Sequence, residues 1–93
     1  MEIAFDEAKS QACFEQRGFD FAYAAQVFLD EARTVQKDTR ADYGEDRYQV
    51  LGKIEGRVFH VVYTWRGAVV RLISARKANL REVKHYEHCS SKA

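Results

Sequence analysis

The stretch VFHVVYTWRGAVVRLIS at residues 58–74 decides the fold. It contains two runs of apolar and aromatic residues, Val58–Trp65 and Ala68–Ser74, which Arg66-Gly67 separates. Runs rich in valine, isoleucine and aromatic residues favour strands, and a two-residue gap with a glycine favours the tight turn of a β-hairpin. The stretch therefore predicts two antiparallel strands joined by a short turn.

Alternating polarity continues upstream of this hairpin. Residues 47–54 alternate with a period of two, and Glu55-Gly56 provides a turn into the hairpin, so an antiparallel meander is expected. A weaker strand is expected at residues 33–36, and residues 38–46 are typical of a polar, acidic loop. A short first strand is expected at residues 2–5.

Capping residues indicate two helices in the first half of the chain. Asp6 is a suitable N-cap for a helix at residues 7–17, which Gly18 closes in the left-handed conformation. Asp20 is a second N-cap, and the residues after it form one apolar face at helical spacing, namely Phe21, Ala24, Ala25 and Phe28. Two packed helices are therefore expected before the meander.

A third helix is expected after Asn79, with Glu82 completing a capping box. Its apolar face is narrow and consists of Leu80, Val83 and Tyr86, and residues 89–93 are expected to fray. The predicted fold is α+β, in the order β-α-α-β-β-β-β-α, with an antiparallel sheet whose open face carries the functional site.

Length and composition limit what the chain can build. Its 93 residues, 46% of them hydrophobic, suffice for one domain at residues 1–93 and are too few for a two-lobed nucleotide-binding enzyme or a barrel enzyme. Cys13 and Cys89 have no metal-ligand or redox spacing, which favours a reduced, cytosolic protein. No secretion signal or membrane-spanning segment is visible, so a cytoplasmic location is expected.

The net charge of +1 conceals two opposite halves. Residues 1–46 carry eleven Asp and Glu against five Lys and Arg, a balance of −6, whereas residues 47–93 carry three against ten, a balance of +7. A concentrated basic half indicates a polyanionic partner. The competing interpretation is an uneven distribution of charge over solvated helices.

The basic residues follow the predicted hairpin. If Arg66-Gly67 forms the turn, Val62 pairs with Arg71 and Thr64 with Val69, and Arg71 lies in mid-strand on the face opposite the apolar side chains. Guanidinium groups fixed on an open sheet face suit a phosphodiester, because their planar fork matches two phosphate oxygens. The pattern predicts a cationic site on this face.

Aromatic and histidine side chains in the basic half each allow two interpretations. Tyr63 is a core residue or a platform for an unstacked RNA base, and Trp65 is expected to be exposed beside the turn. His60, within an apolar strand, is more often a buried structural histidine than a catalyst. His85 and His88 share a helix face but have no third ligand in register, so no metal site is predicted.

A ribonuclease without metal or cofactor fits these features, since the chain contains no zinc, P-loop or catalytic-triad motif. Such an enzyme activates the 2′-hydroxyl for attack on phosphorus, stabilises the developing charge and protonates the leaving 5′ oxygen. Arginines can serve the second task. The candidates for proton transfer are Lys77, Glu82, His85 and Tyr86, and the sequence does not choose among them.

One segment carries a family resemblance. The run Ile73–Ala78, followed by Arg81-Glu82 and Tyr86-Glu87, is similar to the signature of the BrnT toxins of bacterial type II toxin–antitoxin systems, and the similarity covers about residues 3–87. Family members usually have Lys-His where this chain has Gln16-Arg17. That difference directs attention to the basic half.

The resemblance implies a RelE-like fold and an endoribonuclease that cleaves mRNA, free or on the ribosome, and so inhibits translation and growth. It also implies neutralisation by a BrnA-type antitoxin of the ribbon-helix-helix class, in a hetero-oligomer such as two toxins with two antitoxins. Operator DNA would be contacted only through the antitoxin. No cofactor, metal or membrane is implied.

Roles can be assigned on both grounds. Phosphate binding and charge stabilisation are expected of three arginines, Arg66, Arg71 and Arg76. Proton transfer is expected of Lys77, Glu82 or Tyr86. Further RNA contacts are expected from Arg47, Tyr63, Trp65, Arg81 and Lys84. The competing hypothesis is a non-catalytic member that binds an antitoxin or a nucleic acid without cleaving it.

Overall fold

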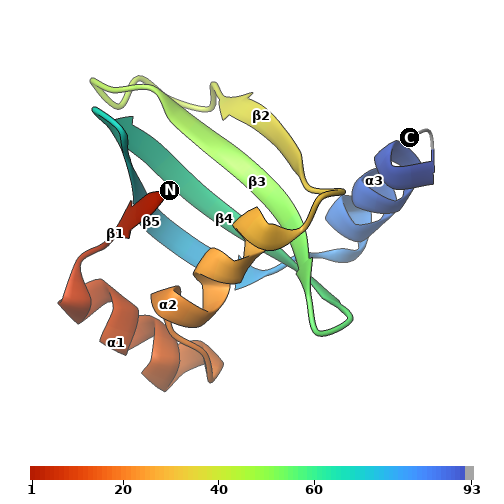
Figure 1. Cartoon of the computed structure of the whole chain (residues 1–93), viewed down its shortest axis with the longest axis horizontal. Helices are drawn as coiled ribbons and strands as arrows, with labels where there is room; N and C mark the ends of the chain where they lie inside the picture. Colours follow the sequence, from red (N-terminus) through yellow and green to blue (C-terminus); the bar gives the residue numbers. More distant parts are fainter. Residues whose placement is uncertain (92–93) are drawn as a thin grey trace.

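A computed structural model describes residues 1–91, with side chains through Cys89, and over these residues the fold is α+β, as predicted (Figure 1). The elements are β1 (Glu2–Ala4), α1 (Glu7–Arg17), α2 (Phe21–Ala24), the 3₁₀ helix η1 (Ala25–Leu29), β2 (Thr34–Asp38), β3 (Arg47–Ile54), β4 (Arg57–Arg66), β5 (Val69–Lys77) and α3 (Leu80–Ser91). The five strands form one sheet in the order β1-β5-β4-β3-β2. All neighbours are antiparallel except β1 and β5, which are parallel, so the expectation of a wholly antiparallel sheet was wrong at this edge.

The predicted helix caps are confirmed. Asp6 accepts hydrogen bonds from the backbone N–H groups of Ala8 and Lys9 at 2.8 and 3.2 Å, and Gly18 ends α1 with φ of 84°. The second helix differs from the prediction, because after one α-helical turn it tightens into η1. Val27 of η1 lies so close to β3 that a side chain at Gly52 would come within 2.7 Å of it. The glycine therefore permits this close approach.

The register of the β4–β5 hairpin differs from the prediction. Gly67 and Ala68 form the turn, with φ of 61° at Gly67, so Arg66 pairs with Val69 and Thr64 with Arg71. A shift in register between Val62 and Tyr63 then changes the pairing further along the two strands. A turn one residue later is sufficient to move every cross-strand partner.

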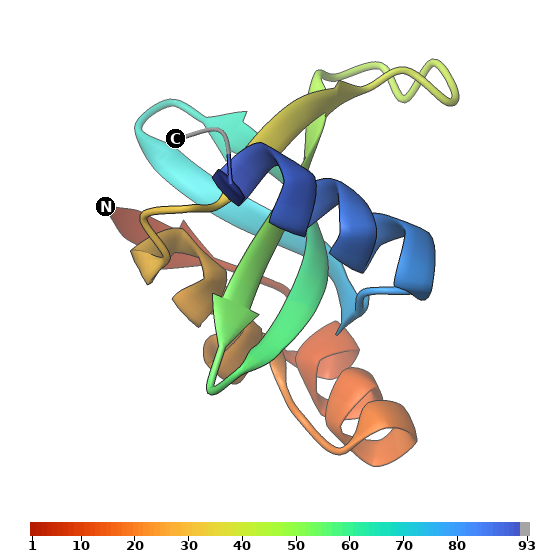
Figure 2. The same ribbon diagram turned by 90° about the vertical axis from the view of Figure 1, so that its right-hand side faces the viewer.

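Different helices cover the two faces of the sheet. α1, α2 and η1 lie on one face, over a core that includes Val50, Val61, Val70 and Leu72, while α3 lies across the other (Figures 1 and 2). Tyr86 of α3 packs in a separate small cluster with Leu51 and Val58. The face predicted to be open is therefore partly covered by α3.

The carboxyl-terminal helix also corrects two expectations. Leu80, predicted to dock the helix, is 68% exposed, whereas Tyr86 is buried and Val83 partly buried. The helix continues through Cys89 to Ser91, where fraying was expected, and residues 92–93 lie outside the described part of the chain.

The start of the predicted polar, acidic loop also differs from the prediction. Asp38, expected to begin this loop, instead ends β2 and is buried.

Candidate functional site

Cross-strand pairing arranges the side chains on the α3 face of the sheet in rows. The first, which we call the Arg71 row, consists of Asp38, Arg47, Thr64 and Arg71; the Gln49 row consists of Gln36, Gln49, Val62 and Ser74; the His60 row consists of Thr34, Leu51, His60 and Arg76. Neighbouring rows on one face are about 7 Å apart, since each residue of a strand advances about 3.3 Å. The Arg71 and His60 rows are too far apart to hold one phosphate group.

A pocket of about 190 Å³ lies where α3 meets the Gln49 and His60 rows. Its sheet side is formed by Thr34, Gln36, Gln49, Leu51 and His60, and its helix side by Arg81, Glu82 and His85. The lining residues contribute one guanidinium, two imidazoles and one carboxylate, set among surface that is mostly apolar. It is the place where the described structure brings charged and titratable groups from the sheet and α3 together.

Glu82 and Arg76 form an ion pair at the edge of this pocket. The two guanidinium nitrogens Nη1 and Nη2 of Arg76 donate to the two carboxylate oxygens of Glu82 at 2.8 and 2.9 Å. Glu82 also completes the predicted capping box with Asn79. The hydrogen bonds from Arg76 lower the pKa of Glu82 to about 2, so this carboxylate is a poor proton acceptor. The guanidinium of Arg76 is likewise engaged by this ion pair.

His60 forms part of the pocket floor and is 3% exposed. Its Nε2 lies 3.1 Å from Oε1 of Gln49 and 3.9 Å from Oε2 of Glu82, while Nδ1 is buried with no hydrogen-bond partner among the described residues. Burial, and then the charge of Arg76, lower the pKa of this imidazole, which is therefore neutral at pH 7. His60 is buried, as the more frequent class of strand histidine is, yet only one of its two nitrogens is satisfied.

Tyr86 is turned away from this pocket. Its hydroxyl donates to Oδ2 of Asp30 at 2.5 Å, and the same carboxylate oxygen accepts from the backbone N–H of Lys53 at 2.7 Å. The side chain is buried against Leu51 and Val58. These contacts attach α3 to the sheet and to the end of η1, which is a structural role.

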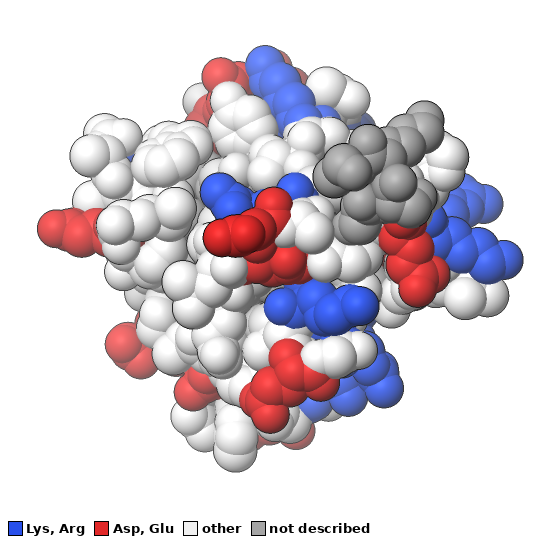
Figure 3. Space-filling view, turned by 45° about the vertical axis from the view of Figure 1, so that its right-hand side comes forward, with Lys and Arg blue, Asp and Glu red and all other residues white. Residues whose placement is uncertain are grey.

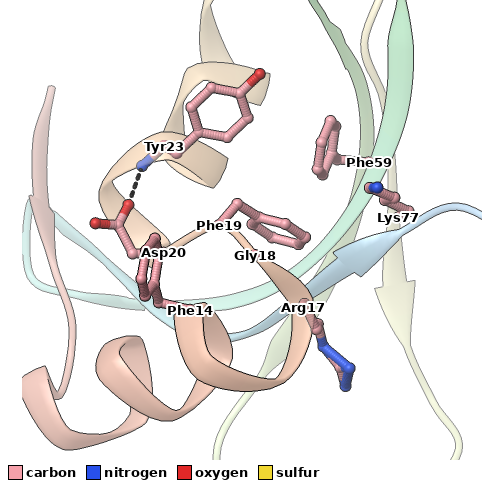
Figure 4. Close-up of a pocket in the computed structure, with 8 residues that line it drawn as sticks. All are labelled: Phe14, Arg17, Gly18, Phe19, Asp20, Tyr23, Phe59 and Lys77. Carbon is pink, nitrogen blue, oxygen red and sulfur yellow. Dashed lines mark hydrogen bonds between the residues drawn. The ribbon is translucent and has the colours of Figure 1, made fainter.

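Three predicted site residues lie on the opposite face of the sheet. Tyr63 belongs to the main core, and Trp65, 48% exposed as expected, contacts its ring from the same side. Lys77 lines a different pocket of about 420 Å³ together with aromatic side chains, Arg17 and Asp20 (Figure 4). The three do not share a surface with Arg71.

The remaining predicted cations lie on the α3 side of the sheet and differ in exposure and in their ion-pair partners. Arg71 has no hydrogen bond or ion pair with any described side chain, and Arg81 and Lys84 are exposed on α3. Arg47 and Arg66 both lie beside Glu45. Figure 3 shows that the Lys and Arg side chains on the visible face form separate groups next to Asp and Glu, so the basic half does not make one continuous basic surface.

The pocket between α3 and the sheet could not be predicted from the sequence, because its lining residues come from four separate elements, β2, β3, β4 and α3. One signal was available. Alternation along β4 places His60 on the same face as Thr64, and hence as Arg71, so a polar face was indicated for this histidine.

Comparison with known families gives the chain an activity. Residues 5–82 match the family described as "Ribonuclease toxin, BrnT, of type II toxin-antitoxin system". The chain belongs to the BrnT toxin family. It is thus a toxin of a type II system with ribonuclease activity and an antitoxin partner. The matched region includes strands β2 to β5 of the sheet, together with Arg81 and Glu82.

Three further observations concern curated relatives, membrane-spanning helices and metal sites. A search of curated proteins gave no match. Within the described residues, no helix is long and apolar enough to cross a membrane. The same residues contain no group of three or more His, Cys, Asp or Glu side chains that could hold a metal ion.

Proposed function

We propose that this BrnT toxin is an endoribonuclease that cleaves mRNA in the pocket between α3 and the sheet, through a mechanism that uses no metal ion. The carrying observation is that this pocket places Arg81 and His85 of α3 beside His60 and Gln49 of the sheet. A helix packed on an antiparallel sheet, with the site between them, also supports grouping the fold with the RelE-like toxins.

The proposed reaction begins with the 2′-hydroxyl of the nucleotide at the cleavage site. His85 accepts its proton, the 2′ oxygen attacks the adjacent phosphorus, and the bond from phosphorus to the 5′ oxygen breaks, which leaves a 2′,3′-cyclic phosphate. The leaving 5′ oxygen then takes one proton, either the proton that His85 accepted or one from water. Arg81 stabilises the charge on the phosphoryl oxygens.

The structure favours His85 over the other candidates for proton transfer. Glu82 is held ionised by Arg76, the Tyr86 hydroxyl is bound to Asp30, and Lys77 lines the pocket on the other face. His85, in contrast, lines the pocket next to Arg81 and is exposed, and its Nε2 lies 3.7 Å from Sγ of Cys89, a weak contact. An imidazole can accept and donate a proton near neutral pH.

The Arg71 row would bind the RNA strand away from the cleaved bond. Arg71 is without an acidic partner there, and Arg47 and Arg66 lie on the same face. Lys84 on α3 adds a cation near the pocket. Phosphates bound at separate points fix the register of a single strand, whereas one arginine cluster on one phosphate would not.

We further propose that the antitoxin is of the BrnA ribbon-helix-helix type and that two toxins and two antitoxins form the neutral complex. Operator DNA would then be bound through the antitoxin alone. An antitoxin that covers the Arg71 row and α3 would block RNA, which explains how the toxin is silenced.

The experiment that tests the ribonuclease proposal compares His85→Asn and Arg81→Ala with the wild type. Purified protein is incubated with RNA in EDTA, and the fragments are analysed for cyclic or 3′-phosphate ends. We expect wild type to cleave and both variants to lose at least about 100-fold in rate, the range for removing a general acid–base group. His88→Asn, which alters the same helix outside the pocket, is the matched control.

Three results would contradict this proposal. Cleavage abolished by EDTA would overturn the metal-independent mechanism. Unaltered cleavage by His85→Asn would remove this histidine from the mechanism. RNA binding by wild type without any fragments would support the non-catalytic alternative.

A further inference from the structure

One carboxylate, Glu45, lies between two arginines of the proposed RNA surface. Its Oε2 is 3.2 Å from Nε of Arg47, and its Oε1 is 3.6 Å from Nη2 of Arg66. The two arginines come from β3 and β4, so the loop that carries Glu45 joins cations of neighbouring strands. Each oxygen of the carboxylate thus faces a different guanidinium group.

The loop between β2 and β3 is held against the sheet at several points. Asp38, buried at its start, accepts from Nε and Nη2 of Arg40 at 2.8 and 2.7 Å and from the hydroxyl of Tyr43 at 3.2 Å. At its end, the hydroxyl of Thr64 donates to the backbone oxygen of Asp46 at 2.6 Å. These bonds place Glu45 over the sheet without using the Glu45 side chain.

Arg47 is oriented independently of Glu45 as well. Its guanidinium lies over the ring of Tyr43, 4.2 Å from the centroid, and this contact does not involve the carboxylate. Arg66 is 62% exposed, and ion pairs this accessible to solvent contribute little to stability. The Glu45 side chain can therefore move away while the two arginines keep their positions.

Two guanidinium groups that converge on the two oxygens of one anion form the arrangement that also binds a phosphate. We propose that Arg47 and Arg66 form a phosphate-binding subsite for the RNA strand, and that Glu45 occupies this subsite in the free toxin and is displaced by an RNA phosphate. The subsite is separate from the pocket that contains His85. This inference rests on the proposed ribonuclease function and specifies where the uncleaved part of the strand is held.

The proposal predicts the sign of one substitution. Glu45→Gln removes the competing charge and should tighten the binding of single-stranded RNA by about two- to fivefold, the range that corresponds to one exposed ion pair. If Glu45 instead serves to position the two arginines for RNA, the same substitution weakens binding. Asp42→Asn changes the charge of the same loop by the same amount outside the arginine pair, and its amide oxygen can still accept the hydrogen bond from Gly44.

The probe is a short single-stranded 2′-O-methyl RNA, which lacks the attacking hydroxyl and so stays intact, and affinity is measured by fluorescence anisotropy. We expect Glu45→Gln to bind more tightly than both wild type and Asp42→Asn, and the gain to disappear when Arg47 and Arg66 are both replaced by Gln. Circular dichroism and thermal unfolding verify that each variant is folded. Equal affinities of Glu45→Gln and Asp42→Asn, or weaker binding by Glu45→Gln, would overturn the subsite.

Cleavage of unmodified RNA by the same samples separates this inference from the proposed function. If wild type cleaves RNA but Glu45→Gln gains no affinity, only the subsite is wrong. If wild type neither binds nor cleaves RNA, both proposals fail.

Discussion

Arg71 and Arg76 are alike in the sequence but differ in the structure. Arg76 is engaged by both oxygens of Glu82, whereas Arg71, half-buried on the sheet, has no acidic partner among the described side chains. An unpaired arginine is available to a ligand at little cost, while a paired one must first give up its partner. We therefore propose separate roles for the two residues, Arg71 in RNA binding and Arg76 in holding α3.

Replacement of each arginine by alanine should separate these roles. We expect Arg71→Ala to unfold at the wild-type urea concentration but to reduce the salt dependence of RNA binding by about 0.7 in log K against log salt, which corresponds to one lost phosphate contact on a single strand. Arg76→Ala should lose about 1–3 kcal/mol of stability, because it leaves the partly buried Glu82 without its charged guanidinium donor. Urea unfolding and a salt titration measure the two effects; a destabilised Arg71→Ala with an unchanged slope would show that the assignment is reversed.

At the scale of elements, α3 is attached to the sheet by apolar and polar contacts. Its apolar contacts include Tyr86 and Val83, whereas Leu80 is exposed, and two of its polar ties are the Tyr86 bond to Asp30 and the Glu82 pair with Arg76. Both polar ties depend on carboxylates that are ionised. The attachment of this helix is therefore sensitive to acid.

The pH dependence of α3 attachment follows from Glu82. Its pKa is about 2 in the folded protein and about 4.3 in an unfolded chain, so the folded state binds fewer protons and the stabilisation is complete above about pH 5. It is lost as the pH falls toward 2. We expect Glu82→Gln to be less stable than wild type in urea at pH 7 and to lose less stability between pH 7 and pH 3.5. Glu87→Gln, on the exposed side of α3, is the control and should keep the wild-type slope.

Elements determined by local chemistry could be predicted from the sequence, and those determined by long-range packing could not. The caps at Asp6, Gly18 and Asn79 act within one helical turn, so their residues identify them. The hairpin register depended on which residue enters the turn, and a difference of one position was enough to misplace the partners of Arg71. Whether Leu80 or Tyr86 docks α3 depends on the orientation of the helix over the sheet, which no local pattern contains.

The candidate site could likewise be predicted only where local sequence patterns determine it. The sequence indicated a polar sheet face and a carboxyl-terminal helix with Arg81 and His85, but their meeting with His60 and Gln49 required the three-dimensional arrangement. The assignment of Tyr86 to proton transfer could not be refined either, because its partner Asp30 lies 56 positions away.

At the scale of the whole molecule, the two sides of the sheet carry different chemistry. The side beneath α3 holds the rows with Arg47, Arg71 and His60, and the side beneath α1 and α2 holds the aromatic pocket with the exposed Phe14 (Figures 2 and 4). An inhibitor that binds the first side would compete directly with RNA at the proposed site. One that binds the second side leaves the proposed cleavage pocket accessible.

Hydrogen exchange of the complex with the antitoxin should identify the inhibited side. We expect added protection in β5 and α3, from Arg66 to Glu87, because direct coverage of the RNA surface explains neutralisation. The control is free toxin at the same pH. Protection confined to α1 and α2, with none from Arg66 to Glu87, would show that the antitoxin acts through the Phe14 side.

The parallel pairing of β1 with β5 has a consequence for the synthesis of the toxin. Glu2 pairs with Val69, 67 positions later, so a growing chain releases β1 from the ribosome long before its partner strand exists. The Arg71 row likewise needs β5, and the proposed pocket needs α3, which follows it. An incomplete chain therefore has neither a closed sheet edge nor the surface proposed to hold RNA. The activity proposed for this pocket is therefore absent until both β5 and α3 have emerged from the ribosome.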